Sequence, residues 1–125
     1  MFREFLKFIY YAVYQLLFSN FLVLRFFGSK KVIILRKKNF KLIPQNIRDL
    51  NDLNTLRQIF IKEEYKFNKD INKLIKVEYN KIVKRKKIPL IIDCGANICA
   101  SANYFSLTYE GSEIVGIEPD QLNFD

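Results

Sequence analysis

The 125-residue sequence predicts an α/β fold, in which a helical N-terminal region with a small β-hairpin precedes one strand–helix–strand unit. Charge and hydropathy both indicate this division. All 21 Lys and Arg residues lie within residues 1–90, whereas residues 91–125 carry six acidic residues and no basic one. From Pro89 onward, two short apolar runs flank a small-residue turn and a helical pattern, which is typical of an α/β unit. We therefore divide the chain into residues 1–27, 28–88 and 89–125.

The composition excludes several kinds of active site. The chain has no histidine and therefore cannot form a Ser/His/Asp triad, a Cys/His dyad or a His-ligated metal site. Cys94 and Cys99 lie five residues apart, a spacing that fits neither a disulfide framework nor a Cys-x-x-Cys pair. We therefore expect no metal site, and a location in the reducing cytoplasm.

Residues 1–27 are strongly apolar, with an uncharged run of 17 residues from Phe8 to Leu24. A membrane-spanning helix needs roughly 20 apolar residues, so this run is at the short limit. We expect one helix that continues to the Gly28-Ser29 pair. Its polar side chains recur every four residues as a narrow stripe, formed by Lys7, Tyr11, Gln15 and Ser19. The stripe favours a helix packed on protein or lying in a membrane interface, and a membrane anchor through residues 1–27 is the alternative.

Residues 28–88 predict a β-hairpin followed by two amphipathic helices. The β-branched run Val32–Leu35 and the segment Phe40–Ile43 are the expected strands. Asp52 is the predicted N-cap of the first helix. The second helix has an apolar face at helical spacing and ends at the basic cluster of residues 84–87. That face comprises Ile71, Leu74, Ile75, Tyr79, Ile82 and Val83.

The basic cluster of residues 84–87, Lys84-Arg85-Lys86-Lys87, complements the dipole at the C-terminal end of a helix, which is its simplest role. An anionic lipid surface is the alternative partner, because the basic half of the chain adjoins the apolar residues 1–27. The sequence contains no helix-turn-helix or zinc module and no basic sheet pattern with interleaved aromatics. We therefore expect no nucleic-acid partner.

Residues 89–125 predict a buried strand, a turn, a helix and a second strand. The first strand is expected at Leu90–Ile92 and the turn at Asp93–Cys99. The helix is expected from Ala100 to Tyr109, stopped by Gly111, and the second strand at Glu113–Glu118. In such a unit a ligand lies beyond the carboxyl ends of the parallel strands, where the first turn meets it.

Two residues of this unit suit a nucleoside ligand. Gly95 lets the backbone approach the ligand, and Glu118 follows it by 23 residues, near the spacing at which an acidic residue meets both hydroxyls of a ribose. A dinucleotide fingerprint would need glycines where this chain has Asn97 and Ala100, and no Gly-Lys-Ser/Thr sequence forms a P-loop. A nucleoside without a pyrophosphate, such as S-adenosylmethionine, therefore fits best.

The stretch from Pro89 to Phe124 resembles the start of the catalytic domain in the FkbM-type family of S-adenosylmethionine-dependent methyltransferases. The family pattern is an apolar strand, Asp-x-Gly-Ala-Asn-x-Gly-x-Ser/Thr, a helix with a Tyr-Phe pair, and a strand that ends Glu-Pro-Asp. This chain matches the pattern at Asp93, Gly95, Ala96, Asn97, Ser101, Tyr104, Phe105, Glu118, Pro119 and Asp120. Residues 52–65 are similar to the helix before this domain in many members. The resemblance implies an incomplete Rossmann-like methyltransferase fold.

The resemblance also implies S-adenosylmethionine as the cofactor. Asp93 and residues 95–97 (Gly95, Ala96 and Asn97) would line its methionine end. Glu118 would hold the ribose hydroxyls, and Ser101 would cap or pack the first turn of the following helix. The implied reaction is O-methylation of a sugar, a lipid-linked glycan or a small metabolite. In the family the catalytic residues belong to later segments, so none is named here.

The chain departs from the family pattern in two places. Cys99 stands where the family has glycine; a positive φ angle there would cost about 1 kcal/mol or more, and otherwise Cys99 would pack as a small apolar side chain. The sequence also ends at Asp125, after the second strand. We therefore expect a fragment that is inactive alone and binds the cofactor weakly or not at all. The alternative is a non-enzymatic, membrane-associated remnant with a basic helix that faces lipid.

Overall fold

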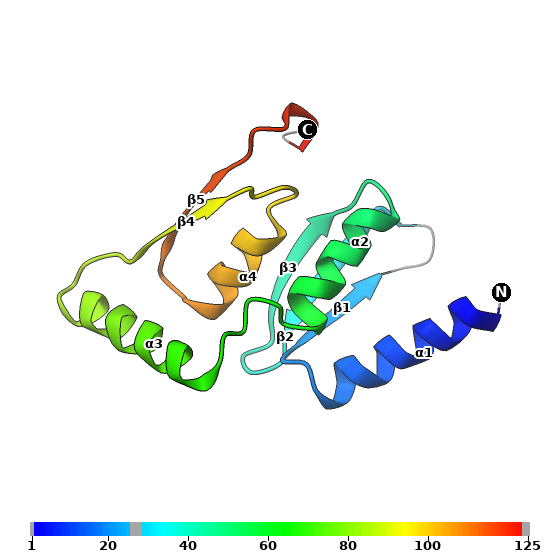
Figure 1. The fold of residues 1–125 in the computed structure, drawn as a ribbon, viewed down its shortest axis with the longest axis horizontal. Helices are drawn as coiled ribbons and strands as arrows, with labels where there is room; N and C mark the ends of the chain where they lie inside the picture. The colour runs from blue at the N-terminus through cyan, green and yellow to red at the C-terminus, as the bar shows by residue number, and fades with distance from the viewer. Residues whose placement is uncertain (1, 26–28, 124–125) are drawn as a thin grey trace. The chain divides into compact units, whose positions relative to one another are not determined.

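The computed structural model describes residues 2–25 and 29–123, which form a mixed α/β protein. The chain divides into two compact units, residues 1–63 and residues 64–125, which we call unit 1 and unit 2. Unit 1 contains an antiparallel sheet of three strands, and unit 2 contains a parallel sheet of two strands (Figure 1). The mixed α/β class expected from the sequence is therefore confirmed.

Unit 1 begins with a helix and continues with the antiparallel sheet and a second helical segment. In chain order these are helix α1 (Phe2–Leu17), strands β1 (Phe21–Arg25), β2 (Lys31–Arg36) and β3 (Lys41–Asn46), helix α2 (Leu50–Leu56) and the π-helical turn η1 (Arg57–Ile61). Strand β2 is central, in the order β1-β2-β3. The expected hairpin is confirmed as β2 and β3.

The helix that the sequence predicts as far as Gly28 ends at Leu17, and the last part of the apolar run forms β1 instead. A turn at Ser19 separates the two. The buried Ser19 Oγ accepts the Phe21 backbone N–H at 3.0 Å and donates to the Phe60 carbonyl at 2.7 Å. Every residue of β1 then pairs with β2, so sheet pairing outweighs the local helical pattern. Gly28 itself lies outside the described residues.

The core of unit 1 joins the sheet to the α2–η1 segment. Phe60 is fully buried, and its ring meets that of Phe21 edge-on, with 5.3 Å between the ring centroids. Val32 and Ile34 alternate along β2 and are also fully buried. Burying one such side chain contributes about 1.5–3 kcal/mol, so these residues hold the helical segment on the sheet.

The N-cap of α2 is Asp49, not the expected Asp52. Asp49 accepts the backbone N–H groups of Asn51 and Asp52 at 2.8 and 3.1 Å. The buried Asp52 instead accepts three bonds from Arg48: the backbone N–H and Nε reach Oδ2 at 2.8 and 2.9 Å, and Nη2 reaches Oδ1 at 2.9 Å. The Arg48 side chain holds the pKa of Asp52 below its ordinary value. Both aspartates precede Leu53 and Leu56, the buried apolar residues of the helix, so the sequence pattern did not distinguish them.

Unit 2 consists of a helix followed by a strand–helix–strand unit. Its elements are α3 (Lys69–Lys84), β4 (Leu90–Cys94), α4 (Ala100–Thr108), β5 (Glu113–Ile117) and a short 3-10 helix, η2 (Gln121–Asn123). Strands β4 and β5 are parallel. The Asn68 side chain caps α3 by accepting the Ile71 backbone N–H, and α3 ends at the basic cluster of residues 84–87. The amphipathic helix and the parallel strand pair expected from the sequence are both confirmed.

The sequence predicts a buried first strand, but one face of the two-stranded sheet is uncovered. Helix α4 packs on the other face and buries Tyr104 and Leu107. Because side chains alternate along a strand, a single helix covers only one face of a sheet. The exposed apolar residues of the uncovered face are Leu90, Ile92, Val115 and Ile117, with 43–59% of their surface accessible.

Helix α1 contains 16 residues. At 1.5 Å per residue it is about 24 Å long, which is less than the roughly 30 Å of a bilayer's hydrocarbon core. Across residues 2–25 and 29–123, no helix combines the length and the hydropathy needed to cross a membrane.

Replacing Asp52 by Asn should lower the free energy of unfolding by about 1–3 kcal/mol at neutral pH, because Arg48 loses its charged acceptor. The lowered pKa of Asp52 means that its ionised form stabilises the fold above the ordinary Asp pKa of about 3.9, and that this contribution is lost as the pH falls through the lowered value. Chemical denaturation of both proteins, repeated as the pH is lowered in steps, measures the difference.

The matched control is Asp49→Asn, which removes a carboxylate from the same turn but keeps a good N-cap side chain. It should cost only a few tenths of a kcal/mol, because Asp49 is exposed and an Asn cap is nearly as good as an Asp cap. If the two variants lost equal stability, the Asp52–Arg48 pair would not have the role assigned to it.

Candidate functional site

The candidate site is the turn that joins β4 to α4, at the carboxyl ends of the two parallel strands (Figure 1). The backbone N–H groups of Gly95 and Ala96 both donate to the Ile117 carbonyl, at 2.7 and 3.1 Å. The turn therefore crosses the end of β5 and is fixed there by two hydrogen bonds.

Gly95 leaves the backbone of this turn open. Its φ angle is +83°, and no heavy atom lies within 4 Å of the position that a Cβ would take. The residue is exposed. A positive φ angle is a conformation that glycine adopts without strain. The open backbone expected at Gly95 is therefore present.

Gly116 is a residue that the sequence pattern did not single out. A Cβ at this position would lie 3.0 Å from the Cβ of the buried Ala96, closer than side chains normally pack. The turn thus lies directly against the backbone of β5. The available signal was a glycine inside an apolar strand pattern, which often marks the close approach of another backbone.

Glu118 is bound to the turn through its carboxylate. Oε2 accepts the Asn97 backbone N–H at 2.6 Å, and Oε1 accepts the Asp120 backbone N–H at 2.8 Å. The N–H groups of Asp120 and Asn97 hold the pKa of Glu118 below its ordinary value, because they stabilise the charged form. Glu118 is therefore a carboxylate at neutral pH, placed at the end of β5 beside the turn.

Asp93 and Ser101 form a second link across the turn. Asp93 is buried near the end of β4, and its Oδ2 accepts the Ser101 hydroxyl at 2.5 Å. Ser101 is buried in the first turn of α4. Of its two expected roles, Ser101 therefore packs the first turn of the helix, and Cys99 occupies the cap position.

Cys99 adopts the left-handed backbone that the family glycine would allow. Its φ and ψ angles are 59° and 21°, and its side chain makes no capping bond to α4. The thiol-bearing residue is exposed, so the alternative of a packed apolar side chain is wrong. Asn97 is also left-handed, with φ 48°, a conformation that asparagine tolerates better than most residues.

The six expected cofactor residues are thus all placed around one turn. Asp93 and Ser101 tie the strand to the helix. Ala96 and Gly95 tie the turn to β5, and Asn97 ties it to Glu118. The arrangement presents one exposed glycine and one ionised carboxylate at the carboxyl end of a parallel sheet, where α/β proteins bind ligands.

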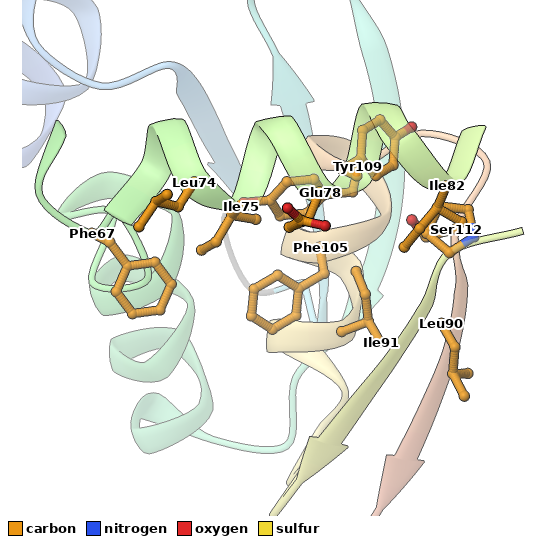
Figure 2. Close-up of a pocket in the computed structure, with 12 residues that line it drawn as sticks. Phe67, Leu74, Ile75, Glu78, Ile82, Leu90, Ile91, Phe105, Tyr109 and Ser112 are labelled. Carbon is orange, nitrogen blue, oxygen red and sulfur yellow. The ribbon is translucent and has the colours of Figure 1, made fainter. Parts of the chain in front are cut away.

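Unit 2 also contains an apolar pocket of about 430 Å³ between α3, α4 and the start of β4 (Figure 2). Figure 2 shows Ile91 and Phe105 below α3, which also contributes side chains to the lining of the pocket. The buried Ser112 hydroxyl at its edge has no hydrogen-bond partner among the residues that the structure describes. None of the six expected cofactor residues lines the pocket, so it is separate from the turn.

Comparison of the chain with protein-family models, with curated proteins and with solved structures gave no match. Within residues 2–25 and 29–123, no group of three or more His, Cys, Asp or Glu side chains is arranged to hold a metal ion. The chemistry of the turn is therefore argued from its own residues.

Replacing Cys99 by Gly should raise the free energy of unfolding by about 0.5–1 kcal/mol. The left-handed conformation costs a side-chain-bearing residue about 1–2 kcal/mol, and the greater freedom of glycine in the unfolded chain offsets part of the gain. Chemical denaturation measures the change. Cys99→Ala is the control, because it removes the thiol but keeps the Cβ; a gain as large as that of the glycine variant would show that the thiol, not the backbone, is unfavourable.

Proposed function

We propose that unit 2 binds S-adenosylmethionine weakly and belongs to an FkbM-type methyltransferase domain with a Rossmann-like fold. The observation that carries this proposal is the position of Glu118, whose ionised carboxylate is held at the end of β5 by backbone N–H groups of the Asp93–Cys99 turn and of Asp120. The residue pattern that resembles the family supports it independently.

The geometry at Glu118 fits a ribose. A carboxylate has about four lone-pair sites; the two backbone N–H groups use one on each oxygen, and the Asn123 side chain also bonds to the carboxylate. In this proposal a ribose diol replaces the Asn123 side chain, so that the carboxylate accepts both hydroxyl hydrogens, and such bonds to a charged acceptor are stronger than neutral ones. Because the carboxylate is already oriented, binding would require little reordering of its side chain.

The methionine end of the cofactor would lie along the turn. Gly95 has open space where other residues carry a side chain, so a ligand can approach the backbone there. In this proposal Gly95, Ala96 and Asn97 line that end, as the resemblance implies. Asp93 would line the same end of the cofactor, and Ser101 keeps Asp93 in position.

When bound, the cofactor would supply an electrophilic methyl group on its sulfonium sulfur. The acceptor proposed from the resemblance is a hydroxyl of a sugar, a glycan or a small metabolite. The residues of this chain have roles in binding and orientation: Glu118 at the ribose, and the turn at residues 93–97 at the methionine end. No residue among them is assigned to the removal of the hydroxyl proton.

The second candidate function is a non-enzymatic protein at a membrane surface. The sequence places its lipid contact on the basic helix, which is α3 in the structure. Unit 2, which contains α3, has nine basic and nine acidic residues, so its net charge is zero. Lipid contact is favoured instead by the exposed apolar side chains of α1, in unit 1. Contact through α1 is compatible with either function of unit 2.

Titration of the ¹⁵N-labelled chain with S-adenosylhomocysteine should shift the amide signals of Gly95, Asn97 and Asp120, because two of these amides bond to Glu118. Glu118→Gln should weaken binding about tenfold to hundredfold, the effect of losing hydrogen bonds to a charged group. The matched control is Glu113→Gln, which removes an exposed carboxylate from the other end of the same strand and should leave the affinity unchanged.

A second ligand pair tests the ribose contact itself. Adenosine should shift the same amides, and 2′,3′-dideoxyadenosine should not, because it lacks both hydroxyls. The proposal is contradicted if millimolar ligand leaves the three amides unmoved, or if Glu118→Gln binds as well as the parent chain. Shifts confined to Phe105 and Tyr109 would place the ligand in the apolar pocket instead.

A further inference from the structure

Helix α1 turns Tyr11 and Gln15, the middle of its predicted polar stripe, toward the protein, whereas Lys7 is exposed. The Gln15 Oε1 accepts the Val23 backbone N–H at 2.6 Å, so this side chain faces β1. The Tyr11 ring lies under the Arg57 guanidinium, with 4.9 Å from Cζ to the ring centroid. This part of the stripe, which a water-soluble helix would turn to solvent, is thus used for contacts within unit 1.

The opposite side of α1 is apolar and exposed. Its residues are spaced by three or four positions, which places them on one face of the helix. We call this set the outward face: Leu6, Ile9, Tyr10, Val13, Leu16 and Leu17, each with 41–68% of its surface accessible. A continuous apolar stripe of this kind on a folded protein marks a surface that meets an apolar partner.

The turn between β2 and β3 extends this surface. Phe40, at the tip of the turn, is 77% exposed and has a left-handed backbone, with φ 54°. The Lys37 Nζ donates to the carbonyls of Gln15 and Leu16, at 2.5 and 3.0 Å, so the turn adjoins the C-terminal end of α1. The β2–β3 turn, which carries Phe40, and the C-terminal end of α1 therefore lie at the same end of unit 1 (Figure 1).

The charge of the chain is concentrated in the unit that carries this surface. Unit 1 has 12 Lys and Arg residues and four Asp and Glu residues, a net charge of +8, whereas unit 2 is neutral. Lys38 and Lys41 are exposed on either side of Phe40 and its neighbour Asn39. Two copies of unit 1 would repel each other, but an anionic surface would attract them. The charge therefore favours a lipid partner over a second copy of the chain.

We propose that unit 1 docks on the surface of an anionic lipid bilayer through the outward face of α1 and the β2–β3 turn. Helix α1 lies parallel to the membrane plane, because at about 24 Å it is too short to span the hydrocarbon core. Its outward side chains and Phe40 enter the boundary between headgroups and acyl chains, while Lys38 and Lys41 contact anionic headgroups. This binding does not depend on the function proposed for unit 2.

Flotation of the full chain with vesicles tests the proposal. The chain should float with vesicles of phosphatidylcholine and phosphatidylglycerol, and much less with phosphatidylcholine alone. The bound fraction should fall as salt is added, because screening weakens the attraction to headgroups. If the folded chain stays at the bottom of the gradient with both kinds of vesicle, the proposal is wrong.

The double variant Leu16→Asp, Leu17→Asp should abolish flotation, because it places two charges in the apolar face. Both side chains are already exposed, so the fold should persist, which circular dichroism verifies. The matched control is Leu50→Asp. Leu50 has the same 66% exposure as Leu16, but it is the first residue of α2 and follows the end of β3 that is farther from the β2–β3 turn. Flotation of the double variant at the level of the parent chain would overturn the proposal.

Neutralising Lys38 and Lys41 tests their contact with anionic headgroups. Lys38→Gln with Lys41→Gln should reduce the affinity for anionic vesicles by about fivefold for each lysine. The control neutralises Lys30 and Lys31, at the other end of β2, and should reduce the affinity less.

Sedimentation of the chain without lipid tests whether the outward face instead binds a second copy of the chain. If the parent chain is a dimer and the double variant Leu16→Asp, Leu17→Asp is a monomer, the outward face is a dimer interface and the lipid proposal is wrong.

Discussion

Two backbone N–H groups share one carbonyl acceptor at the end of β5, and the turn of the candidate site depends on this arrangement. Gly95 and Ala96 both donate to Ile117, so the turn cannot leave the strand without breaking two hydrogen bonds. The same constraint brings Ala96 against β5, where a Cβ at position 116 would lie only 3.0 Å from that of Ala96. It also brings the Asn97 N–H within reach of Glu118. Backbone hydrogen bonds thus fix the shape of the turn, and the turn in turn fixes the position of the Glu118 carboxylate.

Sequence patterns predicted the elements whose contacts are local. Helix α3 has its apolar residues at helical spacing, and the turn after β4 has Gly95 directly after an apolar strand, so both were predictable. Strand β1 was not, because four of its five residues, Phe21–Leu24, continue the apolar run of the helix before them and its stability comes from pairing with β2. The pairing of Asp52 with Arg48 was hidden by Asp49, a second acidic residue with the same local signal. For Cys99 the sequence allowed two outcomes, and the backbone angles together with the exposure of the side chain decide between them.

The division of charge along the sequence differs from the division in space. In the sequence, the basic half ends near Pro89, whereas the boundary between the two compact units falls between residues 63 and 64. The lysines of α3 therefore belong to the same unit as the acidic residues of the strand–helix–strand segment, and the two charges cancel there. The basic character of the chain is a property of unit 1. The polar stripe of α1 was likewise recognised from its spacing, but the direction it faces follows from Gln15 and Val23, which are not neighbours in a helix.

The bond from Ser19 to the Phe60 carbonyl joins residues that are 41 positions apart, and the bond from Asn20 to Glu63 joins residues 43 apart. The core of unit 1 therefore cannot close until about residue 60 has left the ribosome, whereas α1 emerges before that residue. At a synthesis rate of about 5–20 residues per second, this interval lasts several seconds. During that time neither face of α1 has its folded partner, so the nascent chain presents an apolar helix to whatever lies beside the ribosomal exit. During synthesis α1 can therefore make contacts outside the chain before the rest of unit 1 folds against it.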